Sequence, residues 1–317
     1  QTVLVPVTGE ENSFAAKKTI TDNDWSSSFT TFEDLKELAA RTYSEWTHVY
    51  YAGEEALVIS ESLTLPKNMD LYIENDQDLV IPAGVTLTVT SDIQVYGDLT
   101  VEGTLILNSY ARFEGNVTVT GTVKTQSDIH LEWGNDFTGM GNIQFSNSWA
   151  GFVYIYDTET FAELKEAVAV ATANPANEYQ IYLRPDEDIV ISSNLTFPKN
   201  VYFYSWWSNT ITVNAGVTLT FNCYAGISNP MVIKGKLVNN QRISYQGRDN
   251  DAAMQFTSTG SYSGNGYLHI YVNDDDIDYT PYVTGLDTTN MDIVEYQDEW
   301  EHYWQIRDIT GLTRLSA

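Results

Sequence analysis

Residues 63–74 read LTLPKNMDLYIE, and residues 195–206 read LTFPKNVYFYSW. The two stretches lie 132 positions apart, and the same offset relates AGVTLT at 83–88 to AGVTLT at 215–220. Across the 30 positions from 61 onward, 12 are identical at this offset without a gap. One register held over such a span predicts an internal duplication, the usual sign of a repeat architecture.

Each copy begins with the same short pattern, T-F-x-x-L-K, at 31–36 and again at 160–165. A threonine followed three residues later by Asp34 or Glu163 has the spacing of a capping box, which starts a helix. Apolar residues then recur on one helical face. We therefore predict short amphipathic helices over 31–42 and 160–173, the second ending at Asn174 before a proline.

After each predicted helix the apolar period changes from 3.6 to 2, which indicates short strands. Turn residues recur at regular distances, with 16 residues from Pro66 to Pro82 and 18 from Gly97 to Gly115. Coils of this length predict an all-β chain folded as a parallel β-helix, a solenoid for which we expect right-handed winding. An antiparallel sandwich or barrel is the alternative, but its Asn-Gly hairpin turns are scarce here.

These patterns divide the chain into four parts. A leading segment covers 1–30, a first helix-capped solenoid module 31–150, and a second such module 151–273. An acidic, aromatic segment, 274–317, is expected to pack on the second module or to close it, with its alternating apolar residues favouring strands. A helix at the start of each module suits a solenoid, because its open end exposes unpaired strand groups.

Composition excludes several classes of partner. Lys and Arg number 16 against 43 Asp and Glu, a formal net charge of −27 that repels nucleic acid and anionic lipid. No apolar stretch approaches the length of a membrane span, so we expect no membrane insertion. One cysteine, Cys223, excludes an intramolecular disulfide, and its alternation with Leu219 and Phe221 predicts a buried position. The start at Gln1, without Met or an apolar signal region, fits a processed or trimmed form.

The capping pattern T-F-x-x-L-K, followed by L-T-hydrophobic-P-x-N and A-G-V-T-L-T, resembles the pectin-lyase-like β-helix modules of secreted bacterial surface proteins. The resemblance covers roughly 31–125 and 160–240, and its motifs specify coils rather than chemistry. It implies a bacterial protein that is secreted or displayed on the cell surface. Members of this fold include polysaccharide lyases, glycoside hydrolases and non-catalytic adhesins, so fold alone leaves function open.

The sequence assigns no catalytic residue. The Asn-Thr-Asp, Asp-Asp, Gly-His-Gly and Arg-Ile-Lys strings of the resembling hydrolases do not occur together on successive coils. The four histidines lie far apart, without metal-binding spacing. No cofactor is expected, apart from calcium at one loop. There Asp274, Asp275, Asp276 and Asp278 concentrate the oxygen ligands that calcium prefers, although their spacing lacks the EF-hand pattern and a solvated acidic loop is the simpler explanation.

The two copies differ most at the outward positions of one strand. The first copy has Asp70, Tyr72 and Glu74, where the second has Tyr202, Tyr204 and Trp206. Side chains two residues apart share one face of a strand, so the second set predicts an aromatic stripe. Such a stripe is typical of surfaces that bind sugar rings, and the simpler explanation is packing against another part of the chain.

The leading functional hypothesis is a non-catalytic, adhesin-like binding protein that contacts glycan, either polysaccharide or a host-surface glycan, through Tyr202, Tyr204 and Trp206. One alternative is a β-helix polysaccharide lyase or glycoside hydrolase, which would require a carboxylate-rich groove assembled from several coils. A second alternative is a structural spacer within a larger surface protein, which would bind nothing.

Overall fold

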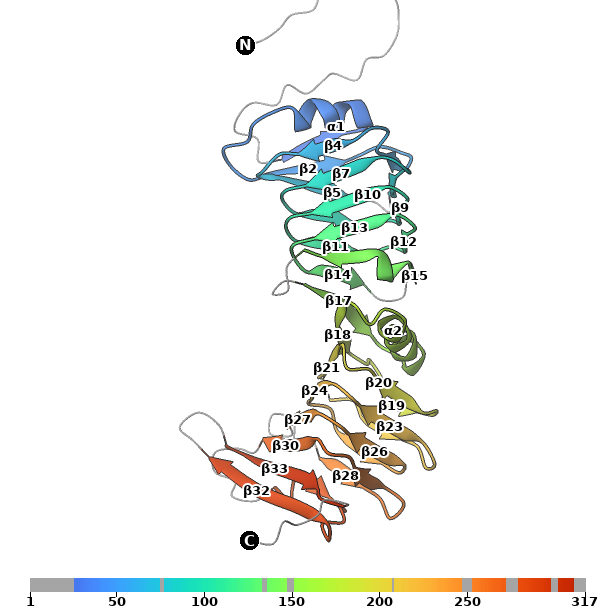
Figure 1. Ribbon diagram of the computed structural model, residues 1–317, viewed down its shortest axis with the longest axis vertical. Coiled ribbons are helices and arrows are strands. Elements are labelled where there is room, and N and C mark those ends of the chain that lie inside the picture. Colours follow the sequence, from blue (N-terminus) through green and yellow to red (C-terminus); the bar gives the residue numbers. More distant parts are fainter. Residues whose placement is uncertain are drawn as a thin grey trace, which may run out of the picture.

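The computed structural model describes residues 26–74, 77–132, 136–146, 151–206, 208–246, 253–271, 279–297 and 302–310. Over these residues the chain forms a parallel β-solenoid of about 10 turns with two short α-helices (Figure 1). Strands of successive turns pair in parallel and stack along the long axis of the molecule. The predicted parallel β-helix is thus confirmed, and the antiparallel sandwich or barrel is wrong.

One 14-stranded sheet, here called sheet A, runs the length of the solenoid. Its strands in spatial order are β1 (Ser26–Phe29), β2 (Thr47–Tyr51), β5 (Met69–Ile73), β8 (Ile93–Val95), β11 (Ala111–Phe113), β14 (Ile129–Glu132), β17 (Phe152–Thr158), β18 (Glu178–Leu183), β21 (Val201–Ser205), β24 (Tyr224–Ile227), β27 (Arg242–Gln246), β30 (Tyr267–Tyr271), β33 (His302–Asp308) and β32 (Met291–Gln297). Pairing is parallel from β1 to β30, whereas β33 is antiparallel to both β30 and β32.

Four smaller parallel sheets complete the turns. Before the second helix, one sheet contains β4 (Leu63–Leu65), β7 (Thr86–Val89), β10 (Thr104–Leu107), β13 (Thr122–Thr125) and β16 (Ile143–Phe145), and the other contains β3 (Leu57–Val58), β6 (Leu79–Ile81), β9 (Leu99–Val101), β12 (Val117–Val119) and β15 (Phe137–Thr138). After it, one sheet contains β19 (Ile189–Ile191), β22 (Ile211–Val213), β25 (Met231–Ile233), β28 (Met254–Phe256) and β31 (Val283–Thr284), and the other contains β20 (Leu195–Phe197), β23 (Thr218–Phe221), β26 (Lys236–Asn239) and β29 (Ser261–Ser263).

Each helix lies in the chain between two neighbouring strands of sheet A. The helix α1 (Phe32–Ala39) follows β1, and α2 (Phe161–Ala173) follows β17. Both begin with the predicted capping box, in which the threonine accepts from the third backbone N–H and the acidic side chain accepts from the cap. The structure confirms both predicted helices, although α1 ends at 39 rather than 42. A short 3₁₀ helix, η1 (Met140–Asn142), precedes β16.

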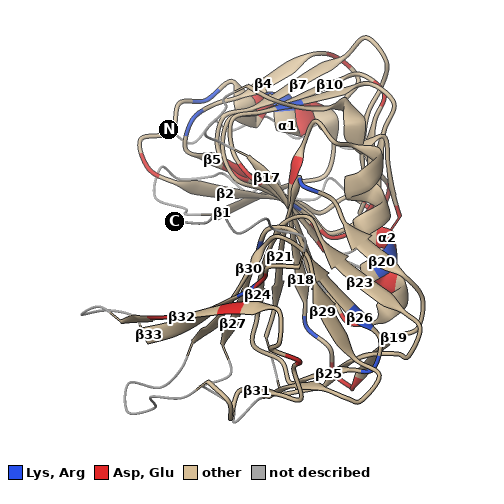
Figure 2. Ribbon diagram, turned by 60° about the horizontal axis from the view of Figure 1, so that its bottom comes forward, with Lys and Arg blue, Asp and Glu red and all other residues tan. Residues whose placement is uncertain are grey.

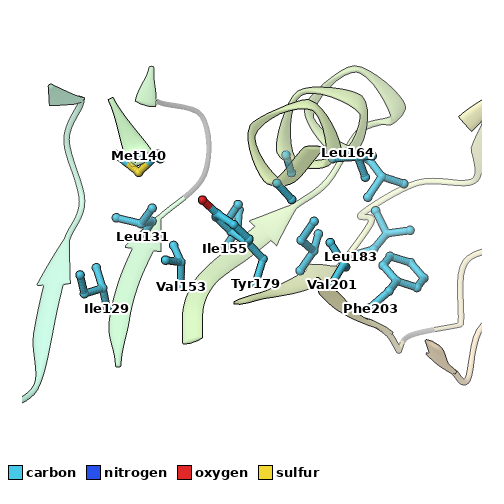
Figure 3. Close-up of a cluster of buried hydrophobic side chains, with 14 of the residues drawn as sticks. Ile129, Leu131, Met140, Val153, Ile155, Leu164, Tyr179, Leu183, Val201 and Phe203 are labelled. Carbon is cyan, nitrogen blue, oxygen red and sulfur yellow. The ribbon is translucent and has the colours of Figure 1, made fainter. Parts of the chain in front are cut away.

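The buried core continues past α2. Alternate residues of sheet A point inward, and Ile129, Val153, Tyr179 and Val201 follow one another along successive strands (Figure 3). Burial of such alternate apolar side chains against the turns above and below is what stabilises a solenoid. The side-chain amide of Asn177 also donates to the backbone carbonyl of Met140, at 2.9 Å, across the point where the helix interrupts the turns.

Glycines sit where consecutive turns approach most closely. A Cβ placed on Gly115 would lie 2.3 Å from the carbonyl oxygen of Gly97, and one on Gly121 would lie 2.0 Å from that of Gly103. The glycine spacing in the sequence therefore reports the stacking of turns. The turn length is not uniform, because cross-turn contacts span 18 residues from Asp98 to Asn116 but 25 from Lys234 to Thr259.

The described part of the C-terminal segment forms strands, as its alternating residues predicted: the short β31 and the longer β32 and β33. In both views the hairpin of β33 and β32 extends to one side of the stacked turns (Figures 1 and 2). Its inward face is anchored by Ile306, which is fully buried opposite Leu268 of β30. Within the described part of the chain, no helix has both the length and the apolar character needed to cross a membrane.

Candidate functional site

The outward face of sheet A carries the aromatic residues singled out from the sequence. Tyr202 and Tyr204 belong to β21, and Trp206 follows its last residue. Between them Phe203 and Ser205 are buried, so the three aromatic side chains share the outer face as predicted.

These three residues belong to a longer row of aromatic side chains, which we call the aromatic ladder. It spans six neighbouring strands of sheet A, from β11 to β24, and so extends to both sides of α2 along the solenoid. Each member contacts at least one other through its ring. The members are Tyr110, His130, Phe152, Tyr154, Tyr156, Tyr182, Tyr202, Tyr204, Trp206 and Tyr224.

In the middle of the ladder, the rings of Tyr156, Tyr182 and Tyr204 overlap face to face rather than lying side by side. The centroids of Tyr156 and Tyr182 are 4.7 Å apart with planes at 15°, and those of Tyr182 and Tyr204 are 5.3 Å apart at 18°. Coplanar neighbours would keep their centroids roughly 6.5 Å apart, since carbon atoms pack at about 3.5–4.0 Å. The ladder is therefore not a flat platform: its middle rings form offset stacks, whereas Phe152 meets Tyr202 edge to face at 87°.

Trp206 departs from this arrangement. Its ring lies 5.2 Å from that of Tyr182 at an angle of 66°, and 6.1 Å from that of Tyr204 at 51°. The guanidinium of Arg184 lies 5.7 Å from its centroid, within the range of a cation–π contact. Trp206 is still 37% exposed, which makes it the ladder side chain with the largest surface left for a ligand.

Polar side chains between the rings fix the positions of the phenols. The hydroxyl of Tyr182 donates to the side-chain oxygen of Gln180 at 2.7 Å, and the nitrogen of that amide donates to the hydroxyl of Tyr154 at 3.4 Å. Among the described residues, the hydroxyls of Tyr156, Tyr202 and Tyr204 have no hydrogen-bond partner. These three hydroxyls can therefore donate to and accept from a bound molecule.

The ladder is uncharged at neutral pH. Burial raises the pKa of Tyr154 to about 12 and raises the pKa values of Tyr156, Tyr182 and Tyr204 above the ordinary 10. Burial also lowers the pKa of His130 below its usual 6.5, so this imidazole stays neutral. On a chain of net charge −27, the ladder side chains are neutral, and the charged groups in contact with their rings, among the described residues, are the guanidinium groups of Arg184 and Arg242.

Sequence comparison of the two copies missed Tyr154, Tyr156 and Tyr182, which provide the centre of the ladder. The available signal was tyrosine at alternate positions in β17, which reads FVYIYDT, and in β18, which reads EYQIYL. These strands flank α2, and at the 132-residue offset Tyr182 of β18 corresponds to Tyr50 of β2, a match that lies outside the 30 positions compared. Only their pairing in one sheet shows that they extend the row of β21.

A second, smaller aromatic pair lies on the same face near β1. Tyr50 stacks on Tyr72 at 5.0 Å, and His48 lies beside both. Asp70, expected to point outward, lies on this face but is only 4% exposed, with an oxygen 3.4 Å from the Nδ1 of His48. Burial raises the pKa of the Asp70 carboxyl above its usual 3.8.

The remaining sequence candidates do not form a second site in the described chain. Asp274, Asp275, Asp276 and Asp278 lie outside the described residues. Within those residues, no three His, Cys, Asp or Glu side chains are grouped as metal ligands. Cys223 is buried as predicted, with 2% of its surface exposed.

The geometry defines the class of this protein as a β-solenoid with an outward aromatic ladder. No known protein-family model, curated protein or solved structure matches the chain. The class therefore rests on the observed pairing of strands alone.

Proposed function

We propose that this is a non-catalytic glycan-binding protein of adhesin type, which contacts a polysaccharide or host-surface glycan through the aromatic ladder. The observation that carries the proposal is the ladder itself, which lies on the outer face of sheet A and includes Tyr202, Tyr204 and Trp206. Contiguous aromatic surface on a soluble chain usually marks a contact site. Phenols and an indole provide apolar surface and hydrogen-bonding groups together, which is the combination that a sugar ring requires.

Two further features support this proposal. The ladder side chains are neutral and carry no acidic group although the chain is strongly acidic, so a ligand that contacts their rings and hydroxyls desolvates no carboxylate of the ladder itself. The rings are also held by their neighbours before any ligand arrives, because each is stacked or hydrogen-bonded to the next. Preorganised side chains lose little rotamer freedom on binding.

The proposal extends to the origin and location of the protein. Matched capping boxes on α1 and α2 support a chain of two duplicated modules, 31–150 and 151–273. Right-handed winding is part of the proposal and follows from the resemblance to pectin-lyase-like β-helices. A stiff solenoid with a binding face suits a bacterial protein secreted or displayed on the cell surface. Calcium at Asp274, Asp275, Asp276 and Asp278 is a separate prediction, and calorimetry without heat at millimolar calcium would contradict it.

The test is affinity electrophoresis through gels that contain neutral or acidic polysaccharides. We expect at least one neutral polysaccharide to retard the wild-type protein and Trp206→Ala to abolish the retardation at an unchanged thermal midpoint. Trp46→Ala is the matched control, because Trp46 is 51% exposed and lies outside the ladder. Retardation by no polysaccharide would contradict glycan binding, and new reducing ends after incubation would contradict the non-catalytic assignment.

A further inference from the structure

The shape of the aromatic ladder contains more information than its chemistry alone. Along the solenoid axis it covers six neighbouring strands, from β11 to β24. Across the axis it is at most three side chains wide, as in Phe152, Tyr154 and Tyr156 of β17. A ligand that uses the whole ladder must therefore be long in one direction, and that direction is the solenoid axis.

The register of sheet A arranges the ladder into two columns. In one column, His130 pairs with Tyr154 and Tyr202 pairs with Tyr224, and the amide of Gln180 occupies the β18 position between the two pairs. In the other, Tyr182 pairs with Tyr204. Paired residues on neighbouring strands follow one another at about 4.7–4.9 Å, the spacing of hydrogen-bonded strands. The ladder is consequently a periodic surface whose repeat is close to the length of one hexose residue in an extended chain.

The free hydrogen-bonding groups follow the same repeat. Because the rings of Tyr156, Tyr182 and Tyr204 cover one another, their outer edges and hydroxyls are what a ligand meets. The hydroxyls of Tyr156 and Tyr204 have no partner among the described residues, and the oxygen of Tyr182 can still accept after donating to Gln180. Regularly spaced donors and acceptors suit a polymer of hydroxyl-bearing units better than a single sugar.

We infer that the aromatic ladder binds one linear, uncharged, β-1,4-linked polysaccharide chain laid parallel to the solenoid axis, with one sugar residue opposite each strand. The inference rests on the proposed function and adds the class of glycan, its direction and its minimum length. A chain that contacts every strand from β14 to β24 spans five sugar residues. Helical, α-linked chains do not keep this repeat along a straight row of strands.

The experiment is isothermal titration calorimetry with β-1,4-linked oligosaccharides of glucose, mannose and xylose, each of two to six residues. For at least one of the three sugars, we expect affinity to rise with each added residue up to about five. Maltose oligosaccharides of the same lengths are the comparison, and their affinity should not rise. The inference would be overturned if affinity did not increase beyond the disaccharide, or if no member of the three series bound. The proposed function fails separately, when no polysaccharide retards the protein in gels.

Phenylalanine variants keep the stacked rings and remove one hydroxyl each, so they test the contacts without risking the fold. We expect Tyr156→Phe and Tyr204→Phe each to weaken the pentasaccharide by about threefold to tenfold, the usual effect of one hydrogen bond. The control is Tyr72→Phe, which alters a stacked tyrosine on the same sheet face but outside the ladder. Equal effects of all three variants would contradict a chain bound along the ladder.

Discussion

Because consecutive turns are in close contact at glycines, adding one methyl group at such a glycine should lower the stability of the fold. Gly121 lies where the turn of β12 and β13 crosses the turn before it, and a Cβ there would lie 2.0 Å from the Gly103 oxygen and 2.4 Å from that of Glu102. Real Cβ contacts stay above 3.0 Å, so the two turns must separate by about 1 Å at this point. That movement stretches two backbone hydrogen bonds of 2.9 Å, from Gly121 to Val101 and from Thr122 to Gly103.

We therefore expect Gly121→Ala to lower the free energy of unfolding by about 2–3 kcal/mol. Two weakened buried hydrogen bonds cost about 1–3 kcal/mol each if lost outright, and partial relaxation reduces this. The smaller entropy of unfolded alanine offsets about 0.4–1 kcal/mol. Gly84→Ala is the matched control, because Gly84 has φ +80° and open space around its Cβ position. The left-handed conformation costs alanine about 1–2 kcal/mol, and the offset of about 0.4–1 kcal/mol leaves a loss of about 0–1.6 kcal/mol.

Urea unfolding followed by circular dichroism measures both variants, and hydrogen exchange locates the change. Repeat proteins open locally, so exchange should accelerate in β9, β12 and β13 first. A Gly121→Ala protein as stable as wild type, or no less stable than Gly84→Ala, would refute the close stacking of turns at this position.

Three further predictions concern single side chains. Asn200→Ala should lower the free energy of unfolding by about 2 kcal/mol, because the Asn200 amide donates to the carbonyls of Ala171, Asn174 and Asn177 at the end of α2. Thermal unfolding measures this loss, and an equal loss in Lys199→Ala, at the exposed neighbouring residue, would contradict the explanation. Burial lowers the pKa of His269 from 6.5 to about 4. As the pH falls from 6.5 towards 4, the unfolded chain binds a proton at this residue before the folded chain does, so the folded state should lose stability. His269→Asn should therefore reduce the difference between the thermal midpoints at pH 7 and pH 4.5, and an unchanged difference would refute this. Burial raises the pKa of Cys223 to about 12, so a maleimide should label the protein only in urea, and rapid labelling of the native chain would be inconsistent with a buried thiol.

The sequence was sufficient to predict the fold because solenoid coils are local. The P-K-N corner shows why the motif recurs: the side-chain amide of Asn68 donates to the carbonyl of Tyr43 after α1, and that of Asn200 donates to the carbonyls of Asn174 and Asn177 after α2. Glycine spacing likewise reports direct contacts between turns, as at Gly103 and Gly121. The asparagine corners and the glycine spacing both reflect contacts between residues one or two turns apart, so both can be recognised in the linear sequence.

The binding surface was predictable only in part, since it depends on pairing between distant strands. Alternation placed Tyr202, Tyr204 and Trp206 on one face, but nothing in the sequence joined them to Tyr156 or Tyr182. That connection requires β17 and β18 to be neighbours although α2 lies between them in the chain. The orientation of the rings could not be predicted from the sequence either, because offset stacking depends on both the spacing of strands and the side-chain rotamers.

Hydroxyl-radical footprinting, read by mass spectrometry, tests the central claim most directly. Tyrosine and tryptophan side chains are oxidised according to their exposure, and a bound polysaccharide shields those it covers. With the polysaccharide that retards the protein in gels, we predict protection of Tyr156, Tyr204 and Trp206 together, while Tyr50 and Tyr296 are oxidised as before. Protection of residues away from sheet A, with the ladder unchanged, would contradict the assignment of the aromatic ladder as the glycan-binding surface.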